Sequence, residues 1–204
     1  MNLLIWNCRG ALSPTFCSNV SELVCVHSPA TMIVNETKVS GDRAKRIADR
    51  LPLDGAIFAN SFGFSVYGNP RFAERHLLWD NLKIVVGLHS MPWVIAGDFN
   101  EVLMGEDKFG GKPVSLGKAL LFKECLDTCK MVDIGFSGPR YTWSNHRPLA
   151  HLVQEQINRV FFNAEWNGLH PEAVVLHLEK THLVHGDSSI LPLFFKKFSN
   201  MSLF

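Results

Sequence analysis

Residues 92–100 read PWVIAGDFN, and this stretch guides the interpretation of the whole sequence. Its apolar part predicts a buried strand, and the polar residues Asp98 and Asn100 follow where that strand ends. Asn7 and Glu36 likewise follow two earlier apolar runs. Taken alone, each of these segments is equally well a turn, a helix cap or a solvated loop. Together they bring carboxylates and carboxamides to the ends of three rigid strands, which predicts one shared site.

Strand and helix patterns alternate along the rest of the chain. Helices are expected near residues 14–27, 41–51, 71–88 and 116–129, and short apolar runs predict strands near 3–6, 31–34, 55–58, 92–96, 131–134, 141–144 and 173–178. In the two longest helices we expect Leu77, Leu120 and Leu121 to face inward. Buried strands covered by helices indicate a layered architecture that combines helices and sheets.

The composition is that of a folded, intracellular chain. Its 204 residues favour one domain, and 47% hydrophobic against 19% charged residues exclude a disordered protein. The net charge of +1 does not by itself indicate nucleic-acid binding. The five cysteines are irregularly spaced, which favours reduced thiols over a zinc site. No run approaches the ~18 apolar residues of a membrane span, and the N-terminus lacks the basic flank of a signal peptide.

The chemistry of the three strand ends points to a hard metal ion. Two carboxylates and two carboxamides offer only oxygen as a metal ligand, which suits Mg²⁺ or Mn²⁺ and not zinc. Such an ion neutralises developing charge and activates water in phosphodiester hydrolysis. The sequence therefore predicts a site for Mg²⁺ or Mn²⁺ whose chemistry would suit phosphodiester hydrolysis.

The order of the motifs resembles that of the endonuclease/exonuclease/phosphatase superfamily. The resemblance is carried by WNCRG at 6–10, ETK at 36–38, YGNP at 67–70 and GDFN at 97–100. EDKFGG at 106–111 and FSGPRYTWSN at 136–145 are similar to the endonuclease domain of plant LINE-type (non-LTR) retrotransposons. The resemblance implies the α+β class, as a four-layer α/β/β/α sandwich. It covers residues 1–193 and leaves 194–204 as an apolar tail.

The resemblance also implies roles for the polar residues. Glu36, Asn7 and Asp187 would hold Mg²⁺. Asn7 and Asn100 would orient the metal, water or phosphate, and Asp98 would position or deprotonate the attacking water.

Two further residues complete the implied site. Tyr67 would contact the scissile phosphate and stabilise its charge, while Trp143 is either part of the DNA-facing wall or a core residue. The implied reaction nicks DNA and leaves a 3′-hydroxyl that primes reverse transcription.

Three departures from the family pattern predict weakened catalysis. Residues 64–66 directly join segments that the family separates by roughly three core strands of ~5–6 residues each. Asn158 stands where the family has an aspartate, so a negative charge is lost near the metal. Ser188, next to Asp187, stands where the family has a histidine. Removing one such group typically lowers the rate ~10²–10³-fold.

The sequence thus predicts a magnesium-dependent DNA-nicking domain that is weakened or inactive. We expect DNA binding to be weak or lost, no membrane association, a monomer, and an intracellular, plausibly nuclear, location. The chain shows no reverse-transcriptase domain. The alternatives are a decayed, non-catalytic retrotransposon fragment and a phosphatase of the same superfamily.

Overall fold

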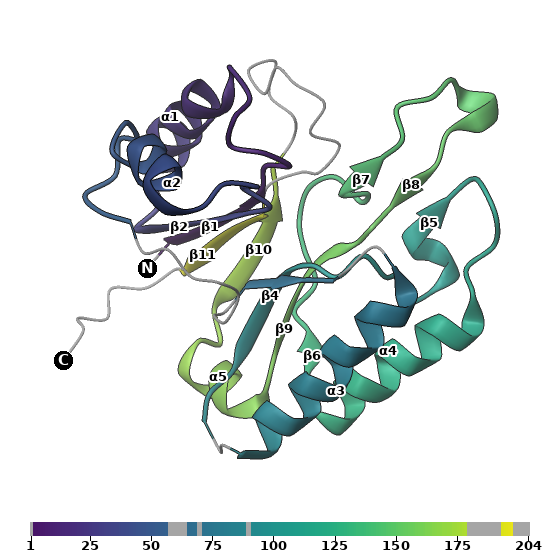
Figure 1. The fold of residues 1–204 in the computed structure, drawn as a ribbon. Helices are drawn as coiled ribbons and strands as arrows, with labels where there is room; N and C mark the ends of the chain where they lie inside the picture. The colour runs from purple at the N-terminus through teal and green to yellow at the C-terminus, as the bar shows by residue number, and fades with distance from the viewer. Residues whose placement is uncertain (1, 57–64, 69–70, 89–90, 179–192, 198–204) are drawn as a thin grey trace.

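Two β-sheets face each other between two layers of helices (Figure 1). The structure is a computed structural model that describes residues 2–56, 65–68, 71–88, 91–178 and 193–197, with the backbone alone described at 65–67 and 193–197. The strand order is β10-β11-β1-β2 in one sheet and β3-β4-β9-β6 in the other. Among the described residues, none of the helices has the length and apolarity that crossing a bilayer requires.

The first sheet is built around the N-terminal strand. β1 (Asn2–Asn7) runs parallel to β2 (Thr31–Asn35) and antiparallel to β11 (Leu193–Lys197), which also pairs with β10 (Ala173–His177). Because side chains alternate along a strand, Leu4 and Trp6 point to the helix side. There they pack with α1 (Phe16–His27), and residues of α2 (Gly41–Ala48) join the same cluster. The ring of Trp6 stacks on Phe16 with 5.6 Å between centroids.

The second sheet is built around the strand of the PWVIAGDFN stretch. β4 (Val94–Asp98) runs parallel to β3 (Ser65–Tyr67) and antiparallel to β9 (Asn158–Phe162), which also pairs with β6 (Val132–Asp133). α3 (Phe72–Leu88) and α4 (Leu116–Thr128) cover its outer face. Four buried rings fill this layer: Trp79, Phe99, Phe122 and Phe161.

The two inner faces form a third, smaller core between the sheets. Ile5 of β1 and Val175 of β10 meet Ala96 of β4 and Val160 of β9 in one buried cluster. Each of these residues has a sequence neighbour whose side chain faces a helical layer, because side chains alternate between the two faces of a strand. The four-layer α+β sandwich expected from the resemblance is therefore confirmed.

A small extension carries the segments EDKFGG at 106–111 and FSGPRYTWSN at 136–145. β5 (Lys108–Phe109), β7 (Trp143–Ser144) and β8 (Gln154–Glu155) form a three-stranded sheet. Gly110 has φ +70°, and a Cβ there would lie 2.1 Å from the Leu152 carbonyl oxygen, so only glycine fits. Arg140 donates from Nε to the Glu106 carbonyl at 3.0 Å, which joins the two segments.

The remaining elements are short. They comprise the 3₁₀ turns η1 (Gly105–Asp107) and η2 (Leu149–His151) and the helix α5 (Ala164–Leu169). Asn163 caps α5, since its side-chain oxygen accepts from the Trp166 amide.

Two sequence predictions about the framework were wrong, and a third falls partly outside the described residues. Residues 194–197 of the expected tail lie in β11, because their backbone groups pair on both sides with β1 and β10. Leu77 is 56% exposed, and Leu120 and Leu121 are 63% and 46% exposed, so these leucines lie outside the core. The expected strand at 55–58 is not seen at Gly55 and Ala56, and its other residues lie outside the described part.

The predicted internal deletion falls next to the first strand of the second sheet. β2 and β3 are the outermost strands of their sheets among the described residues. Missing strands at this point of the chain would have to extend one of these edges. The deletion stays a prediction.

Candidate active site

The ends of two parallel strand pairs, β1 with β2 and β3 with β4, meet at one edge of the sandwich. Asn7 is the last residue of β1 and lies opposite Asn35, the last residue of β2, so Glu36 follows beside it. Asp98 is the last residue of β4 and lies opposite Tyr67, the last residue of β3. Contacts between β1 and β4 bring the two sheets together here. The polar residues of separate motifs therefore converge, as their positions after strands predicted.

The Asn7 carboxamide joins the two carboxylates. Its Nδ2 donates to Glu36 Oε1 at 2.9 Å and to Asp98 Oδ2 at 3.2 Å. The side-chain amide nitrogen has two hydrogens, and each of them is donated to one of the two carboxylates. Asn7 and Asp98 are buried, whereas the Glu36 side chain keeps 16% of its surface exposed. The cluster is thus closed on the protein side and reaches the surface through Glu36.

Asn100 fixes the other oxygen of Asp98. Its backbone N–H donates to Asp98 Oδ1 at 2.9 Å, and its Nδ2 donates to the Gly68 carbonyl at 2.6 Å. Asn100 has φ +50°, a conformation that asparagine tolerates better than most residues. The Gly68 N–H in turn donates to the Asp98 carbonyl at 2.6 Å. These bonds tie the end of β3, and hence the Tyr67 backbone, to the Asp98 turn.

A glycine is required where β3 leaves the sheet. A Cβ on Gly68 would lie 2.1 Å from the Phe99 carbonyl oxygen, so the two chains could not approach as they do. The sequence analysis named Tyr67 in this motif and missed the contribution of its neighbour. The YGNP pattern itself was the available signal, because glycine marks close backbone approach.

Burial and a second acidic side chain change the pKa of Asp98. Burial, and to a smaller extent the charge of Glu36, raise the pKa of Asp98 to about 7, against the lowering effects of the Asn100 N–H, the Asn7 amide and Arg9. Lys38 contacts Glu36 at 4.0 Å but is 65% exposed. The two acids therefore share a neutral amide, and no buried cation of the described part of the chain lies beside them. A divalent cation with oxygen ligands would supply the missing positive charge.

The loops around this cluster have unusual backbone conformations. Glu36, Arg9 and Lys38 have φ values of +51°, +54° and +54°. For such residues a left-handed conformation costs roughly 1–2 kcal/mol each. The Ala11 N–H donates to the Thr37 carbonyl at 2.8 Å and holds the two loops together. Strain of this kind gathers where function fixes a side chain.

Asn158 lies directly across the sheet from Asp98. The two residues are register partners between β9 and β4, and Asn158 is buried. Thr142 Oγ1 accepts from the Ile157 and Asn158 N–H groups, at 3.0 Å each, and so orients this turn. A carboxylate at 158 would stand next to Asp98. Among the described residues, no group of three or more His, Cys, Asp or Glu side chains could hold a metal ion.

Buried ion pairs behind the site were missed by the sequence analysis. Arg159 pairs with Asp107 and with Asp133, and all three take part in one charged group next to Asn158. Asp107 also accepts from the Leu103 and Met104 N–H groups at 2.9 Å each. The pairs therefore fasten the chain that follows the GDFN motif to β9 and β6.

Several predicted site residues remain without a described side chain. Asp187 and Ser188 lie outside the described residues, and Tyr67 is described by its backbone alone. Trp143 is half-buried in β7. The structure thus brings together Asn7, Glu36, Asp98 and Asn100, with Asn158 beside them.

No protein-family model and no curated protein matches this sequence. Solved structures do match over nearly the whole chain. An AP endonuclease from Archaeoglobus fulgidus has a TM-score of 0.70 at 13% identity, covering 98% of this chain and 100% of that chain. The 3′ phosphatase NExo from Neisseria, bound to product DNA hairpin, has a TM-score of 0.69 at 14% identity, covering 97% and 99%. The endonuclease domain of TRAS1, a telomere-specific non-LTR retrotransposon, has a TM-score of 0.62 at 10% identity, covering 98% and 99%.

At these identities the likeness shows the fold. This chain therefore shares the fold of these two endonucleases and this phosphatase.

Proposed function

We propose that this chain is a DNA-nicking endonuclease domain of the plant LINE type whose catalysis is weakened. The observation that carries the proposal is the Asn7 amide, which joins Glu36 and Asp98 at the meeting point of separate strands. Support comes from neighbours of the same fold, among them a retrotransposon endonuclease domain and a protein bound to a DNA hairpin. The segments 106–111 and 136–145 favour the plant LINE branch over a phosphatase.

The donor set fits Mg²⁺ or Mn²⁺. Glu36 would hold the ion, with Asn7 beside it and Asp187 as the further ligand that the resemblance implies. A bound divalent ion supplies neutralisation of the charge that develops on the phosphate. The raised pKa of Asp98, whose burial and neighbouring Glu36 disfavour ionisation, supports this part of the proposal.

The other steps of the proposed reaction are assigned to side chains of the protein. Asp98, which the Asn7 amide and the Asn100 N–H hold through both oxygens, positions the attacking water and accepts its proton. A pKa near 7 suits a general base at neutral pH. Asn100 keeps this carboxylate in place, and Tyr67, at the end of the strand beside it, contacts the phosphate.

Weak catalysis follows from two substitutions. Asn158 places a neutral amide across from Asp98, and Ser188 replaces the phosphate-contacting histidine implied by the resemblance. Each removes charge or a donor from the reacting centre. DNA as partner, a nuclear location and a monomeric state belong to this proposal. A decayed fragment without catalysis is the competing proposal, favoured by the same two residues.

Plasmid nicking with Mg²⁺ separates these proposals. We expect slow nicking by the natural chain and ~10²–10³-fold faster nicking by the Asn158→Asp, Ser188→His double variant. Asp98→Asn should abolish both activities. Asp127→Asn, which removes an exposed carboxylate on α4, is the matched control and should change neither. Absence of nicking by the folded double variant would favour the fragment, and nicking that survives Asp98→Asn would overturn the proposed site.

A further inference from the structure

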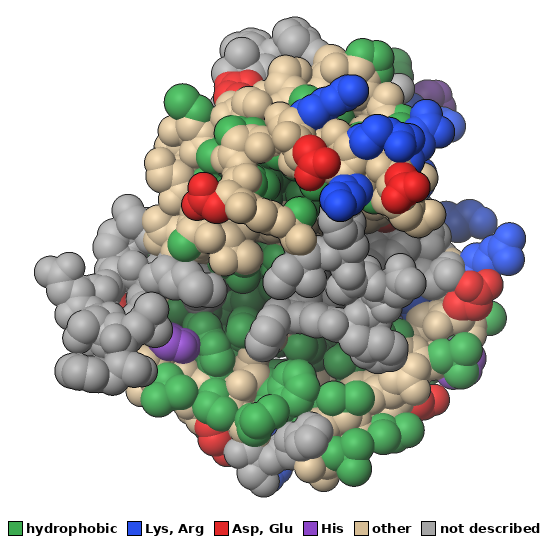
Figure 2. All heavy atoms as spheres, turned by 60° about the vertical axis from the view of Figure 1, so that its left-hand side comes forward, with side chains coloured by type: hydrophobic (Ala, Val, Ile, Leu, Met, Phe, Trp, Pro, Cys, Tyr) green, Lys and Arg blue, Asp and Glu red, His purple; other side chains and the backbone are tan. Residues whose placement is uncertain are grey.

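The outer layer formed by α1 and α2 carries a concentration of cations that the catalytic cluster does not use. Residues 38–50 contain five Lys and Arg residues against two Asp residues, a net charge of +3, whereas the whole chain carries +1. Figure 2 shows Lys and Arg side chains gathered over the upper part of the molecule, with a few acidic side chains between them. The chain is therefore nearly neutral as a whole but has a positively charged surface at residues 38–50.

Three of these cations form a stripe. Arg43 and Arg46 are spaced i and i+3, which places them on one side of α2, and Arg50 follows in the turn just after the helix ends. Ala44 is buried on a different side of the helix, and all three arginines are exposed. At 1.5 Å per residue the stripe is about 10 Å long. We call Arg43, Arg46 and Arg50 the α2 arginine stripe.

The stripe differs from the cations of the opposite helical layer. On α3 and α4, Lys83 lies 3.5 Å from Asp80 and Lys123 lies 3.3 Å from Asp127. None of the three stripe arginines forms an ion pair with another residue in the part of the chain that the structure describes. Like charges at this helical spacing destabilise the helix slightly, so the arrangement favours an external anion.

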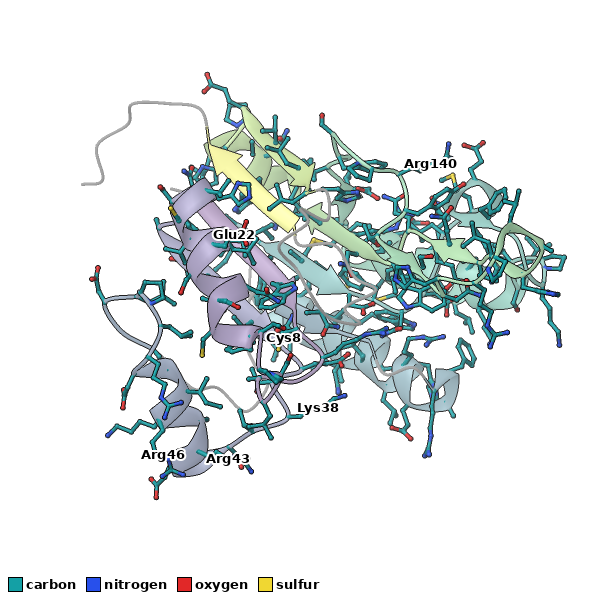
Figure 3. All side chains as sticks on the ribbon, turned by 90° about the horizontal axis from the view of Figure 1, so that it is seen from above. Cys8, Glu22, Lys38, Arg43, Arg46 and Arg140 are labelled. Carbon is teal, nitrogen blue, oxygen red and sulfur yellow. The ribbon has the colours of Figure 1, made fainter. Side chains whose placement is uncertain are left out.

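The positive surface continues to the candidate active site. Lys38 precedes the stripe by five residues, and it lies 4.0 Å from Glu36. Arg9 lies close enough to lower the pKa of Asp98, although burial dominates and raises it. Figure 3 shows Lys38, Arg43 and Arg46 on the same side of the molecule, with Cys8 marking the strand end that carries Asn7. The sugar-phosphate backbone of a DNA duplex that extends from the site toward α2 would lie next to Lys38 and then next to the stripe.

We propose that the α2 arginine stripe binds the phosphate backbone of duplex DNA beside the nicking site. Phosphates of one strand follow each other at ~3.4 Å along the helix axis, so a 10 Å stripe matches roughly three of them. Backbone contacts of this kind fix the register of the duplex and read no sequence. This inference rests on the proposed nuclease function but concerns binding, which is measured separately from cleavage.

The test is the salt dependence of binding, measured by fluorescence anisotropy with a labelled duplex in EDTA. In the variant, Arg43→Gln, Arg46→Gln and Arg50→Gln are combined. The control combines Lys83→Gln, Lys123→Gln and Lys130→Gln, which changes the net charge equally on the other helical layer. In the stripe variant, the slope of log K against log salt should be shallower by about 2.7 than in the natural chain. Between 50 and 200 mM salt, the affinity of the variant for DNA should therefore fall about 40-fold less than that of the natural chain. The control should keep the slope.

A charge-preserving variant protects the test against misfolding. Replacing the three arginines by lysine should retain most of the slope, because counterion release depends on charge. An unchanged slope in the glutamine variant, or equal losses in stripe and control, would overturn the proposal. So would tighter binding of a single-stranded RNA of equal length than of the duplex. Because the assay contains no metal, loss of nicking alone leaves this result unaffected, and the two proposals fail separately.

Discussion

Acidic side chains lie inside the protein in two neighbouring regions, and these regions differ in whether a cation lies beside the acids. Behind the site, Arg159 holds the buried Asp107 and the half-buried Asp133, and Arg75 holds the buried Glu101 at 2.9 Å. At the meeting of β1, β2 and β4, Asp98 is equally buried but faces Glu36 and a neutral amide. Charge compensation in the first region stabilises the fold. In the second region the described residues supply no such cation, and the divalent ion of the proposed function would complete the charge balance there.

The largest expected effect comes from breaking the compensated region. Arg159→Met should lower the free energy of unfolding by about 3–5 kcal/mol, because Asp107 and Asp133 would keep their charge without the cation that neutralises it. Urea denaturation of the purified chain measures this change. A loss below ~1 kcal/mol would mean that these pairs contribute little and that the contrast between the two regions is false.

The uncompensated region should respond in the opposite direction. In the metal-free chain, Asp98→Asn should raise stability at pH 8, since it removes a carboxylate that burial disfavours. The upper limit is about 4 kcal/mol, because the pKa rises from 3.8 to about 7 and each unit is worth about 1.4 kcal/mol. A destabilised Asp98→Asn variant at pH 8 would contradict this.

The pH dependence has a definite sign. The pKa of Asp98 is higher in the folded chain, so its contribution to stability is present at low pH and is lost as pH rises from about 4 to about 7. The difference between the natural chain and Asp98→Asn should therefore grow over this window and level off above it. Denaturation in EDTA at a series of pH values measures it, with Asp127→Asn as the control that should show no such window.

A smaller effect is expected from the turn that holds Asp98. Asn100→Ala should cost about 1–2 kcal/mol, because alanine tolerates the left-handed conformation less well. The variant also loses the bond from Nδ2 to the Gly68 carbonyl. Asn100→Gly keeps the conformation and loses only the amide, so it should cost less in thermal denaturation. Equal losses in both variants would assign the whole effect to the side chain.

The smallest effect is expected at the exposed pair of the two LINE-like segments. Arg140 lies 3.1 Å from Glu106, but their side chains are 51% and 76% exposed. Arg140→Met should therefore change stability by less than about 1 kcal/mol. The same substitution at Arg159 should cost several times more. Similar costs at the two positions would show that burial does not decide the strength of these pairs.

Much of the site could be predicted because its residues follow strands. Asn7, Glu36 and Asp98 each come after an apolar run that forms β1, β2 or β4, and strand direction then determines where they meet. The helix faces were harder to predict. Leu77 and Leu120 are exposed although they lie in helices rich in leucine. With apolar residues on several sides of a helix, periodicity cannot identify the buried side.

The compensated ion pairs could not be predicted for a different reason. Asp107, Asp133 and Arg159 belong to three segments far apart in sequence, and no local pattern links them. β11 was equally hidden, since pairing on both sides with β1 and β10 turns an apolar segment into a central strand. Such features depend on tertiary contacts, which a single sequence does not reveal.

Metal binding tests the central claim most directly. Calorimetric titration of the whole chain with Mn²⁺ at pH 8 should show one site, weakened at least ~10-fold by Glu36→Gln and by Asp98→Asn, with Asp127→Asn unchanged. Binding should also raise the melting temperature of the natural chain, by mass action on the folded state. Equal Mn²⁺ affinity in all four proteins would contradict the claim that Glu36 and Asn7 hold a divalent cation beside Asp98.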